Sequence, residues 1–505
     1  MIQSRMEAAM QKYLSYKAAL LEPSTMDTQT KLMAATGAWL VRLTTRAPPG
    51  DTRLPDTQLP PADLSSPLSF VPEFVLENLC EHLLLVRRFN PAHFEQVGPR
   101  LGELLLVILC YMDQPGLVRN PHLRARLAES LECLLPGHEV QGQPNILGSY
   151  QRQAVFQDHQ HSLRIAPAIL HVFVSIEETG HAVQFEQKFQ YRRPMYDIIK
   201  YVWEIDTFKT KFRQLAEEAE RDIECEQPPL FLRFINLLIN DAIFLLDEGL
   251  NYMKQIQEKE AERAGWSSLP EAERTEAERG FQHMSMLARY HNIMGIETIS
   301  VLELLTTSIT QVITHPTMAD RLAAMLNYFL KTLTGPDRKS FKVSNLEKYS
   351  FKPGEVVEKI SQICINLSHS ETFIKAISTD DRSYCPDLFS WAENVLLKVS
   401  RADLATTLRS VADKVGVAKD SLVAEERLLE DCPDEFLCPI MSVIMTDPVT
   451  LPSSKQTVDR TTIARHLLSD QSDPFNRAPL TMDMVEPHQE LRDRVRLWME
   501  QKRGK

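Results

Sequence analysis

The chain has 505 residues, 43% of them hydrophobic and 25% charged, with a formal net charge of −12. These values are ordinary for a folded soluble protein of about three domain-sized units or one extended repeat, and the negative charge argues against a general surface for nucleic acid or anionic membrane. No stretch approaches the roughly 18 uninterrupted apolar residues of a membrane span.

The N-terminal sequence, MIQSRMEAAMQKYLSY, lacks the basic and apolar segments of a secretory signal. It is typical of the interior of a helix, which suggests a fragment or a shortened product. Eight cysteines are scattered along the chain. Without a signal peptide, that pattern favours free thiols in a reducing compartment, so we expect the cytosol or nucleus and no disulfides.

Two segments predict long surface loops in the first half of the chain. Residues 46–72 hold seven prolines, which exclude a continuous helix. Residues 135–161 are polar and rich in turn formers.

From residue 228 the sequence predicts long buried helices. Pro228 and Pro229 stand where a helix begins, and apolar residues then recur around nearly its whole circumference. We expect Asn236, Asn240 and Asp241 on this helix to hydrogen-bond between stacked helices rather than bind a substrate. Similar patterns follow over 281–313, 317–335 and 353–377.

Successive paired helices of this kind indicate an armadillo-like α-solenoid with degenerate repeats, mainly α in class. The charged stretch 259–280 interrupts them and predicts two solvated helix ends around a turn, with a docking surface as the alternative. Near residues 425–432 the long helical patterns end, and signals of strands, turns and short helices follow. We therefore expect a helical core over 1–430 and a separate small α+β module over 431–505.

The module begins with apolar loop segments and a predicted strand at Val449–Leu451, which returns through Thr457 and Val458 as a hairpin. Asp459 is placed to cap the helix RTTIARHLLSD. A second loop, DPFNRAPL at 473–480, precedes a short helical turn and a final helix with an apolar stripe.

A module of this size often needs a metal or another cross-link. The run Cys438-Pro-Ile-Met resembles the start of a zinc-binding RING, but the segment offers only Cys432, Cys438, His466 and His488 and no CxxC pair. Two zinc sites of four ligands each cannot be built from these residues. We therefore predict that charge-assisted hydrogen bonds brace the loops, through Asp447, Asp459, Arg460, His466 and Asp473.

The order DEFLCPIM, DPVTLPSS, VDRTTIARHLLSDQSDPFNRAPLTMD resembles a U-box, the zinc-free relative of the RING. TDPV, TVDRTTIARHLL and DPFNR followed by PLT resemble the ubiquitin conjugation factors that elongate ubiquitin chains, in particular their vertebrate A-type branch. Upstream, NPHLRARLAE and FINLLINDAIFLLDE resemble the helical core of that family. Family proteins are roughly twice as long, so the resemblance implies that this sequence is a C-terminal half.

The resemblance implies a ligase that binds a ubiquitin-charged conjugating enzyme and promotes transfer of ubiquitin from the enzyme's thioester to a lysine, feeding proteasomal degradation. No cofactor or metal is implied. Ile440 and Pro474 match the family's docking patch, and Phe475 is either their neighbour or a core residue. Arg477 matches the catalytic position that bridges conjugating enzyme and ubiquitin, a role for which a planar guanidinium fork is suited.

Two positions depart from the family pattern. Ser442 replaces an aromatic contact residue of some U-boxes, which would narrow the choice of conjugating enzyme, and His488 replaces an asparagine that supports the loops. A nucleophilic role for Cys438 is an alternative, but no neighbouring motif supplies an activated Cys–His pair.

Beyond the conjugating enzyme and ubiquitin, the resemblance implies the segregase ATPase valosin-containing protein and proteasome delivery factors as partners, with no nucleic acid or membrane. A rival hypothesis is a non-catalytic helical scaffold whose U-box only docks conjugating enzymes.

Overall fold

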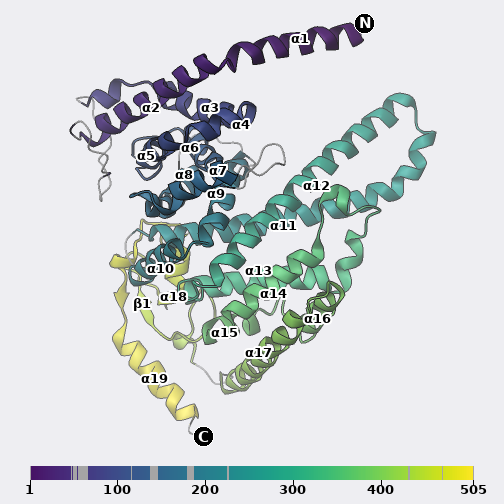
Figure 1. Ribbon diagram of the computed structural model, residues 1–505. Helices are drawn as coiled ribbons and strands as arrows, with labels where there is room; N and C mark the ends of the chain where they lie inside the picture. Colours follow the sequence, from purple (N-terminus) through teal and green to yellow (C-terminus); the bar gives the residue numbers. More distant parts are fainter. Residues whose placement is uncertain are drawn as a thin grey trace. The chain divides into compact units, whose positions relative to one another are not determined.

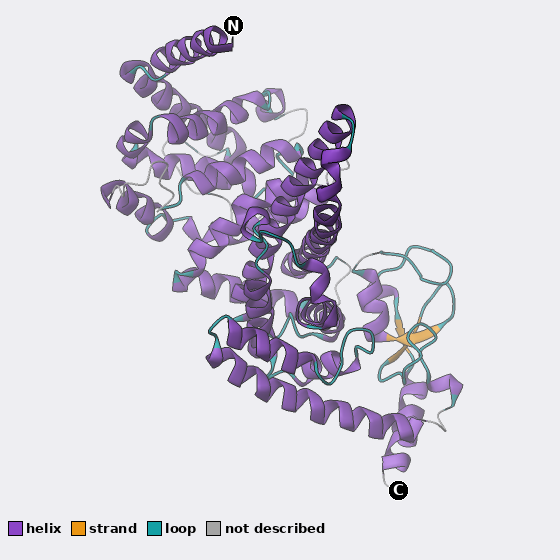
Figure 2. Cartoon of the chain, turned by 90° about the vertical axis from the view of Figure 1, so that its right-hand side faces the viewer, coloured by secondary structure: helices purple, strands orange, loops and turns teal. Residues whose placement is uncertain are grey.

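The computed structural model describes residues 2–503 apart from 47, 49–53, 55–65, 115, 137–145, 179–186, 224–226, 430–432 and 469. The described residues are mainly helical, with one small three-stranded sheet near the C-terminal end (Figures 1 and 2). The expected class, a helical core with a small α+β module, is therefore confirmed. In the part of the chain that is described, no helix has both the length and the apolar character needed to cross a bilayer.

The chain divides into two compact units, Met1–Phe212 and Arg213–Lys505. In the first unit, α2 packs on α5, α3 packs on α6, and α6 packs on α9. Every residue of α5 from Leu104 to Met112 is buried, because its sequence is apolar on all sides. The helices are α1 (Ile2–Leu20), α2 (Pro23–Thr45), α3 (Phe74–Phe89), α4 (Pro91–Gln96), α5 (Leu101–Met112), α6 (Pro121–Cys133), α7 (Ile146–Gln157), α8 (Ile165–Glu178), α9 (Gln187–Trp203) and α10 (Asp206–Arg221), which crosses the boundary.

The expected loop at 135–161 is wrong over Ile146–Gln157, which forms α7. Phe156 is fully buried, and Arg152 lies fully buried in an ion pair with Glu95, which Arg87 also contacts. The inward face of this helix carries an arginine that is buried because its charge is paired. That face therefore lacks the regular spacing of apolar residues from which a helix is predicted. Most of the expected loop at 46–72 lies outside the described residues, and Pro67–Phe70 forms one 3₁₀ turn.

In the second unit, α11 and α12 form a long antiparallel pair, drawn in teal in Figure 1. Further along, α12 packs on α14, α13 packs on α15 and α16, and α17 packs on α14, α15 and α16. The helices are α11 (Leu230–Glu262), α12 (Glu271–Thr306), α13 (Pro316–Thr334), α14 (Pro353–Leu367), α15 (Glu371–Thr379), α16 (Leu388–Lys398) and α17 (Ala402–Leu429).

Polar groups of α11 serve the packing, as the sequence predicts for Asn236. Its amide oxygen accepts a hydrogen bond of 2.5 Å from Arg321 on α13, and Asp241 is buried. Gly249 allows α12 to approach, because a Cβ there would stand 2.7 Å from the Asn292 side-chain oxygen. The charged stretch 259–280 contains the end of α11, a 3₁₀ turn at Arg263–Ser268 and the start of α12, as expected.

The C-terminal module holds the sheet. Its elements are a 3₁₀ turn at Asp434–Phe436, β1 (Pro448–Thr450), β2 (Thr457–Asp459), α18 (Arg460–Leu467), a 3₁₀ turn at Met482–Met484, β3 (Glu486–Pro487) and α19 (Gln489–Arg503). The strand order is β2-β1-β3, and both pairings are antiparallel, with Val449 opposite Val458 and Pro487. A cluster of buried apolar residues from all of these elements except β3 forms the core of the module.

Candidate functional site

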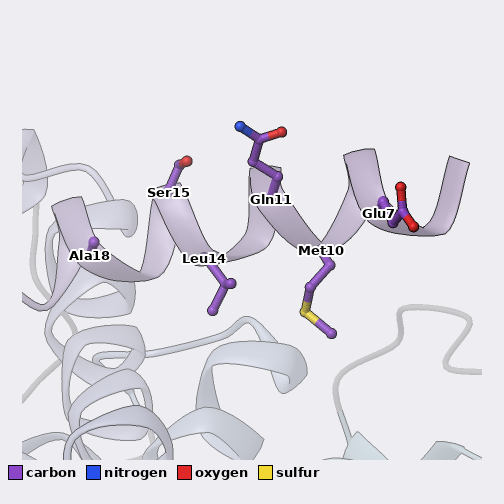
Figure 3. Close-up of a pocket in the computed structure, with 6 residues that line it drawn as sticks. All are labelled: Glu7, Met10, Gln11, Leu14, Ser15 and Ala18. Atoms are coloured by element: carbon purple, nitrogen blue, oxygen red, sulfur yellow. The ribbon is translucent and has the colours of Figure 1, made fainter. Parts of the chain in front are cut away.

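A shallow hollow runs along α1, but it offers no chemical site. It is lined by Glu7, Met10, Gln11, Leu14, Ser15 and Ala18, all from one helix. Figure 3 shows Met10 and Leu14 pointing to the opposite side from Gln11 and Ser15, so no pair of reactive groups converges. The candidate site is therefore the C-terminal module, where the predicted functional residues lie.

The first loop of the module is a closed turn that displays apolar side chains. Leu437 and Ile444 pair as an isolated bridge at its base, and the Cys438 N–H donates to the Val443 carbonyl at 2.8 Å. Ser442 has a left-handed backbone, with φ of 55°, which lets the chain reverse. As a result Ile440, with its neighbours Met441 and Val443, points into solvent rather than into the core, with Ile440 39% exposed.

The second loop has the same construction. Ser472 and Pro479 pair as a bridge at its base, and the Arg477 N–H donates to the Asp473 carbonyl at 2.8 Å, with Arg477 in a left-handed conformation (φ 60°). Pro474, Phe475 and Arg477 are all exposed. Phe475, for which the sequence allowed a core position, is a surface residue.

Asp459 ties the segment directly after the first loop to the start of α18. Its Oδ1 accepts hydrogen bonds from the Thr461 N–H (3.0 Å) and hydroxyl (2.6 Å), which is the capping role that the sequence predicts. Its Oδ2 accepts from the N–H groups of Thr446 (2.8 Å) and Asp447 (3.0 Å) and from the Thr446 hydroxyl. One buried carboxylate therefore joins two segments.

Asp447 and Arg460 form a second connection between the same segments. The Arg460 Nε donates to the Asp447 Oδ2 at 2.9 Å, and the Arg460 N–H donates to the Asp447 carbonyl at 2.9 Å. Arg492 on α19 lies 3.5 Å from the other carboxylate oxygen of Asp447. The final helix is thereby linked to the segment directly after the first loop.

Asp473 ties the second loop to the turn between β1 and β2. Its Oδ1 accepts from the Phe475 N–H at 2.9 Å, and its Oδ2 accepts from the Ser453 hydroxyl (2.6 Å) and the Ser454 N–H (3.2 Å). Burial by itself would raise the pKa of Asp473. The hydrogen bonds from Ser453, Phe475 and Ser454 outweigh that effect and hold the pKa below its ordinary value of 3.8.

Two histidines add to the bracing. The His466 Nε2 lies 2.8 Å from the Ser472 carbonyl, so this nitrogen carries the proton and donates to the base of the second loop. The His488 Nδ1 accepts from the Leu491 N–H at 3.3 Å, and the backbone N–H of His488 donates to the Pro448 carbonyl at 2.9 Å. The histidine that replaces asparagine in the family pattern thus caps α19 and binds β1.

Both loops are anchored to the two ends of α18. Asp459 holds the first loop at the N-terminal end, and His466 holds the second loop near the C-terminal end. At roughly 1.5 Å per residue these anchors lie about 10 Å apart along the helix. The exposed side chains of both loops are thus displayed from a single rigid element.

Cys438 is not placed for nucleophilic chemistry. Its thiol is fully buried, with the sulfur 3.5 Å from the Asp459 N–H and 4.0 Å from the Thr462 hydroxyl. Among the described residues no group of three or more His, Cys, Asp or Glu side chains could hold a metal ion. Cys432 lies outside the described residues. Met441, at the position of the second RING cysteine, is an exposed residue of the first loop.

The structure gives all five predicted bracing residues hydrogen-bond partners, and it exposes all four predicted docking residues. Sequence reasoning did not identify Thr446 as a partner of Asp459, or Met441 and Val443 as exposed neighbours of Ile440. Because Thr446 and Asp459 are 13 positions apart, the sequence offered no local signal for that contact.

Comparison with known proteins places this geometry in a family. A family profile described as "Ubiquitin elongating factor core" matches residues 1–415, and a profile described as "U-box domain" matches residues 432–504. The chain is 41% identical over 505 residues to "Ubiquitin conjugation factor E4 A" of Bos taurus, covering 99% of this chain and 47% of the relative.

A more distant relative matches most of the chain as well. "E4 ubiquitin-protein ligase UFD2" of Saccharomyces cerevisiae is 30% identical over 447 residues, covering 86% of this chain and 45% of the relative. The chain therefore spans less than half the length of these curated relatives. The match of the core profile to most of the chain, followed by the U-box, shows that the chain belongs to the family of U-box ubiquitin elongating factors.

Proposed function

We propose that this chain is a ubiquitin ligase of the chain-elongating class, which acts by holding a ubiquitin-charged conjugating enzyme in an orientation ready for attack. The observation that carries the proposal is the pair of braced loops. The first loop exposes Ile440, and the second loop exposes Phe475 and Arg477. The Arg477 guanidinium has no hydrogen-bond or ion-pair partner among the described residues. The names of the relatives support the same activity.

In the proposed reaction, an amine of a substrate or ubiquitin lysine attacks the thioester carbonyl between ubiquitin and the conjugating enzyme. The isopeptide bond forms as the enzyme's cysteine leaves as a thiolate. The chain forms no covalent bond, which agrees with the full burial of Cys438. Its contribution is proximity and orientation, since fixing the closed arrangement of enzyme and ubiquitin reduces the entropic part of the barrier.

The roles divide between apolar and charged groups. Ile440, Pro474 and Phe475 would contact an apolar surface of the conjugating enzyme, because exposed apolar side chains on rigid loops lose little entropy on binding. Arg477 would donate hydrogen bonds to both conjugating enzyme and ubiquitin, which a fork of five N–H donors permits and a single ammonium does not.

Partners and location extend the proposal. The family resemblance supports valosin-containing protein and proteasome delivery factors as partners that would receive the modified substrate. We also propose the cytosol or nucleus as the location, because six described cysteines are free thiols and five of these are buried. Neither environment would oxidise them.

A reconstituted reaction tests the proposal. It contains activating enzyme, a panel of conjugating enzymes, ubiquitin and this chain, and it is read by ubiquitin chain formation and by binding of the uncharged conjugating enzyme. Arg477→Ala should lower the transfer rate at least about tenfold while binding persists, because only the charged complex uses the bridge. Ile440→Ala should weaken binding as well. Arg496→Ala, an exposed arginine on α19, is the matched control and should have no effect.

Two outcomes would decide against this assignment. Equal transfer by wild type and Arg477→Ala would remove the bridging role. Binding of conjugating enzymes without any transfer would favour the scaffold hypothesis.

A further inference from the structure

Within the second unit, the U-box contacts the helical core through α18. This helix packs on α13; both helices are labelled in Figure 1. The Arg465 Nη1 lies 2.7 Å from the Asp320 Oδ2. Both side chains are partly exposed. A partly exposed ion pair contributes little stability by itself in water. A further interaction is therefore needed to hold the U-box against the core.

An apolar contact lies at the same side of the U-box. Ile223 and Pro228, from the segment between α10 and α11, line a small hollow together with Leu467, Leu468 and Met482 of the module. Leu467 and Met482 belong to the core cluster of the U-box, whereas Leu468 does not. The helical core therefore meets the U-box where its apolar interior reaches the surface.

The contact leaves the docking loops open. On the U-box side, the hollow and the ion pair use residues of α18 together with Leu468, Gln471, Leu480, Thr481 and Met482. None of the docking residues Ile440, Pro474, Phe475 and Arg477 is among them. However, α18 is the element that anchors both loops, through Asp459 and His466. Fixing α18 on the core therefore fixes the direction in which the two loops point.

We propose that Asp320, Ile223 and Arg465 are positioning residues that hold the U-box in one orientation on the helical core. A conjugating enzyme docked on the loops then presents its thioester in one direction relative to the core and to whatever the core carries. The orientation of the U-box on the core exists without a conjugating enzyme. Only its effect on the direction of ubiquitin transfer rests on the proposed function.

The first test measures orientation in the complete chain. Spin labels are introduced as non-natural residues at Met286 on α12 and Leu497 on α19, both exposed, and the distance distribution between them is measured. The wild type should give one narrow distribution. The double variant Asp320→Arg with Ile223→Asp places repulsive and desolvated charges in the contact, and it should lose the narrow distribution. All substitutions lie on the core side, so the U-box itself is unaltered.

Conservative and matched variants separate positioning from damage to the fold. Asp320→Glu retains the carboxylate and should keep the narrow distribution. Asp337→Arg reverses an exposed charge elsewhere on the core and should also keep it. An unchanged distribution in the double variant would overturn the proposal, as would equal broadening by Asp337→Arg.

The second test concerns transfer. In a self-modification assay the lysines of the helical core are the candidate acceptors, and mass spectrometry identifies those that are modified. In the wild type we expect modification at a restricted set of lysines, and in the double variant a shift to a wider set. Discharge of the conjugating enzyme to free lysine should be unchanged, because the loops are intact. A wild type without any discharge would count against the proposed function, while the distance measurement would still decide the orientation.

Discussion

Asp459 offers the sharpest test of how the U-box holds together without a metal. Its carboxylate accepts from the Thr461 N–H at the start of α18 and from the N–H groups of Thr446 and Asp447, directly after the first loop. Replacing it by alanine removes an N-cap, which costs about 1 kcal/mol. It also leaves two part-buried N–H groups without their acceptor, at about 1 kcal/mol each.

The expected loss for Asp459→Ala is therefore about 3 kcal/mol, a large part of the roughly 5 kcal/mol that a module of this size has available. Asp459→Asn keeps one acceptor oxygen for either the helix or the loop. It should lose about half as much, because its NH₂ group would face N–H donors on the other side.

Hydrogen exchange in the complete chain measures this loss locally. About 3 kcal/mol corresponds to roughly a hundredfold increase in the opening equilibrium of the module, so amides of β1, β2 and α18 should lose protection by that factor. Amides of α12 and α14 serve as an internal reference and should not change. Asp470→Ala, at an exposed aspartate of the same module, is the control. Unchanged protection in Asp459→Ala, or an equal loss in Asp470→Ala, would refute the reasoning.

Three further predictions concern the same module. Because the pKa of Asp473 is lowered in the folded state, its contribution to stability should be complete above pH about 5 and disappear as the pH falls below 3.8; the difference in unfolding free energy between wild type and Asp473→Asn should shrink over that range. A chelator should leave the thermal unfolding of the U-box unchanged, since protein groups satisfy the bracing carboxylates Asp447, Asp459 and Asp473; a marked drop would indicate a bound metal. Cys438→Ala should retain Arg477-dependent transfer per folded molecule, and loss of transfer by a folded variant would revive the nucleophile alternative.

The local parts of this fold could be predicted from the sequence. Pro228 and Pro229 mark the start of α11, which begins at Leu230. Asp459 precedes a helix whose second residue is Thr461, so its capping role follows from spacing alone. These predictions depend on groups only a few residues apart, and no distant part of the chain has to be known.

Other features depend on distant neighbours and could not be predicted. The segment 353–377 reads as one helix, but Ser370 caps a new helix and separates α14 from α15. The short strand β3 exists only because Glu486 and Pro487 meet β1. The contact of Arg465 with Asp320 joins residues 145 positions apart. A surface arginine and a surface aspartate carry no sign of each other in sequence.

The two buried bracing carboxylates, Asp459 and Asp473, show how local and distant information combine. In Asp459 and Asp473 alike, Oδ1 accepts from the N–H two residues later, at Thr461 and Phe475. This local hydrogen bond can be predicted from the sequence, because aspartate commonly forms it at a turn or at the start of a helix.

The second oxygen makes the cross-link. In each case Oδ2 accepts from a hydroxyl and an N–H of a segment at least 12 residues away, which is the segment directly after the first loop for Asp459 and the Ser453–Ser454 turn for Asp473. A zinc ion joins loops by sharing ligands from each, and here a carboxylate does so by sharing its two oxygens. Only the carboxylate form offers two equivalent acceptors, so asparagine can retain one connection but not both. The module can therefore display Ile440 and Arg477 from fixed loops although Met441 stands where a RING would place a metal ligand.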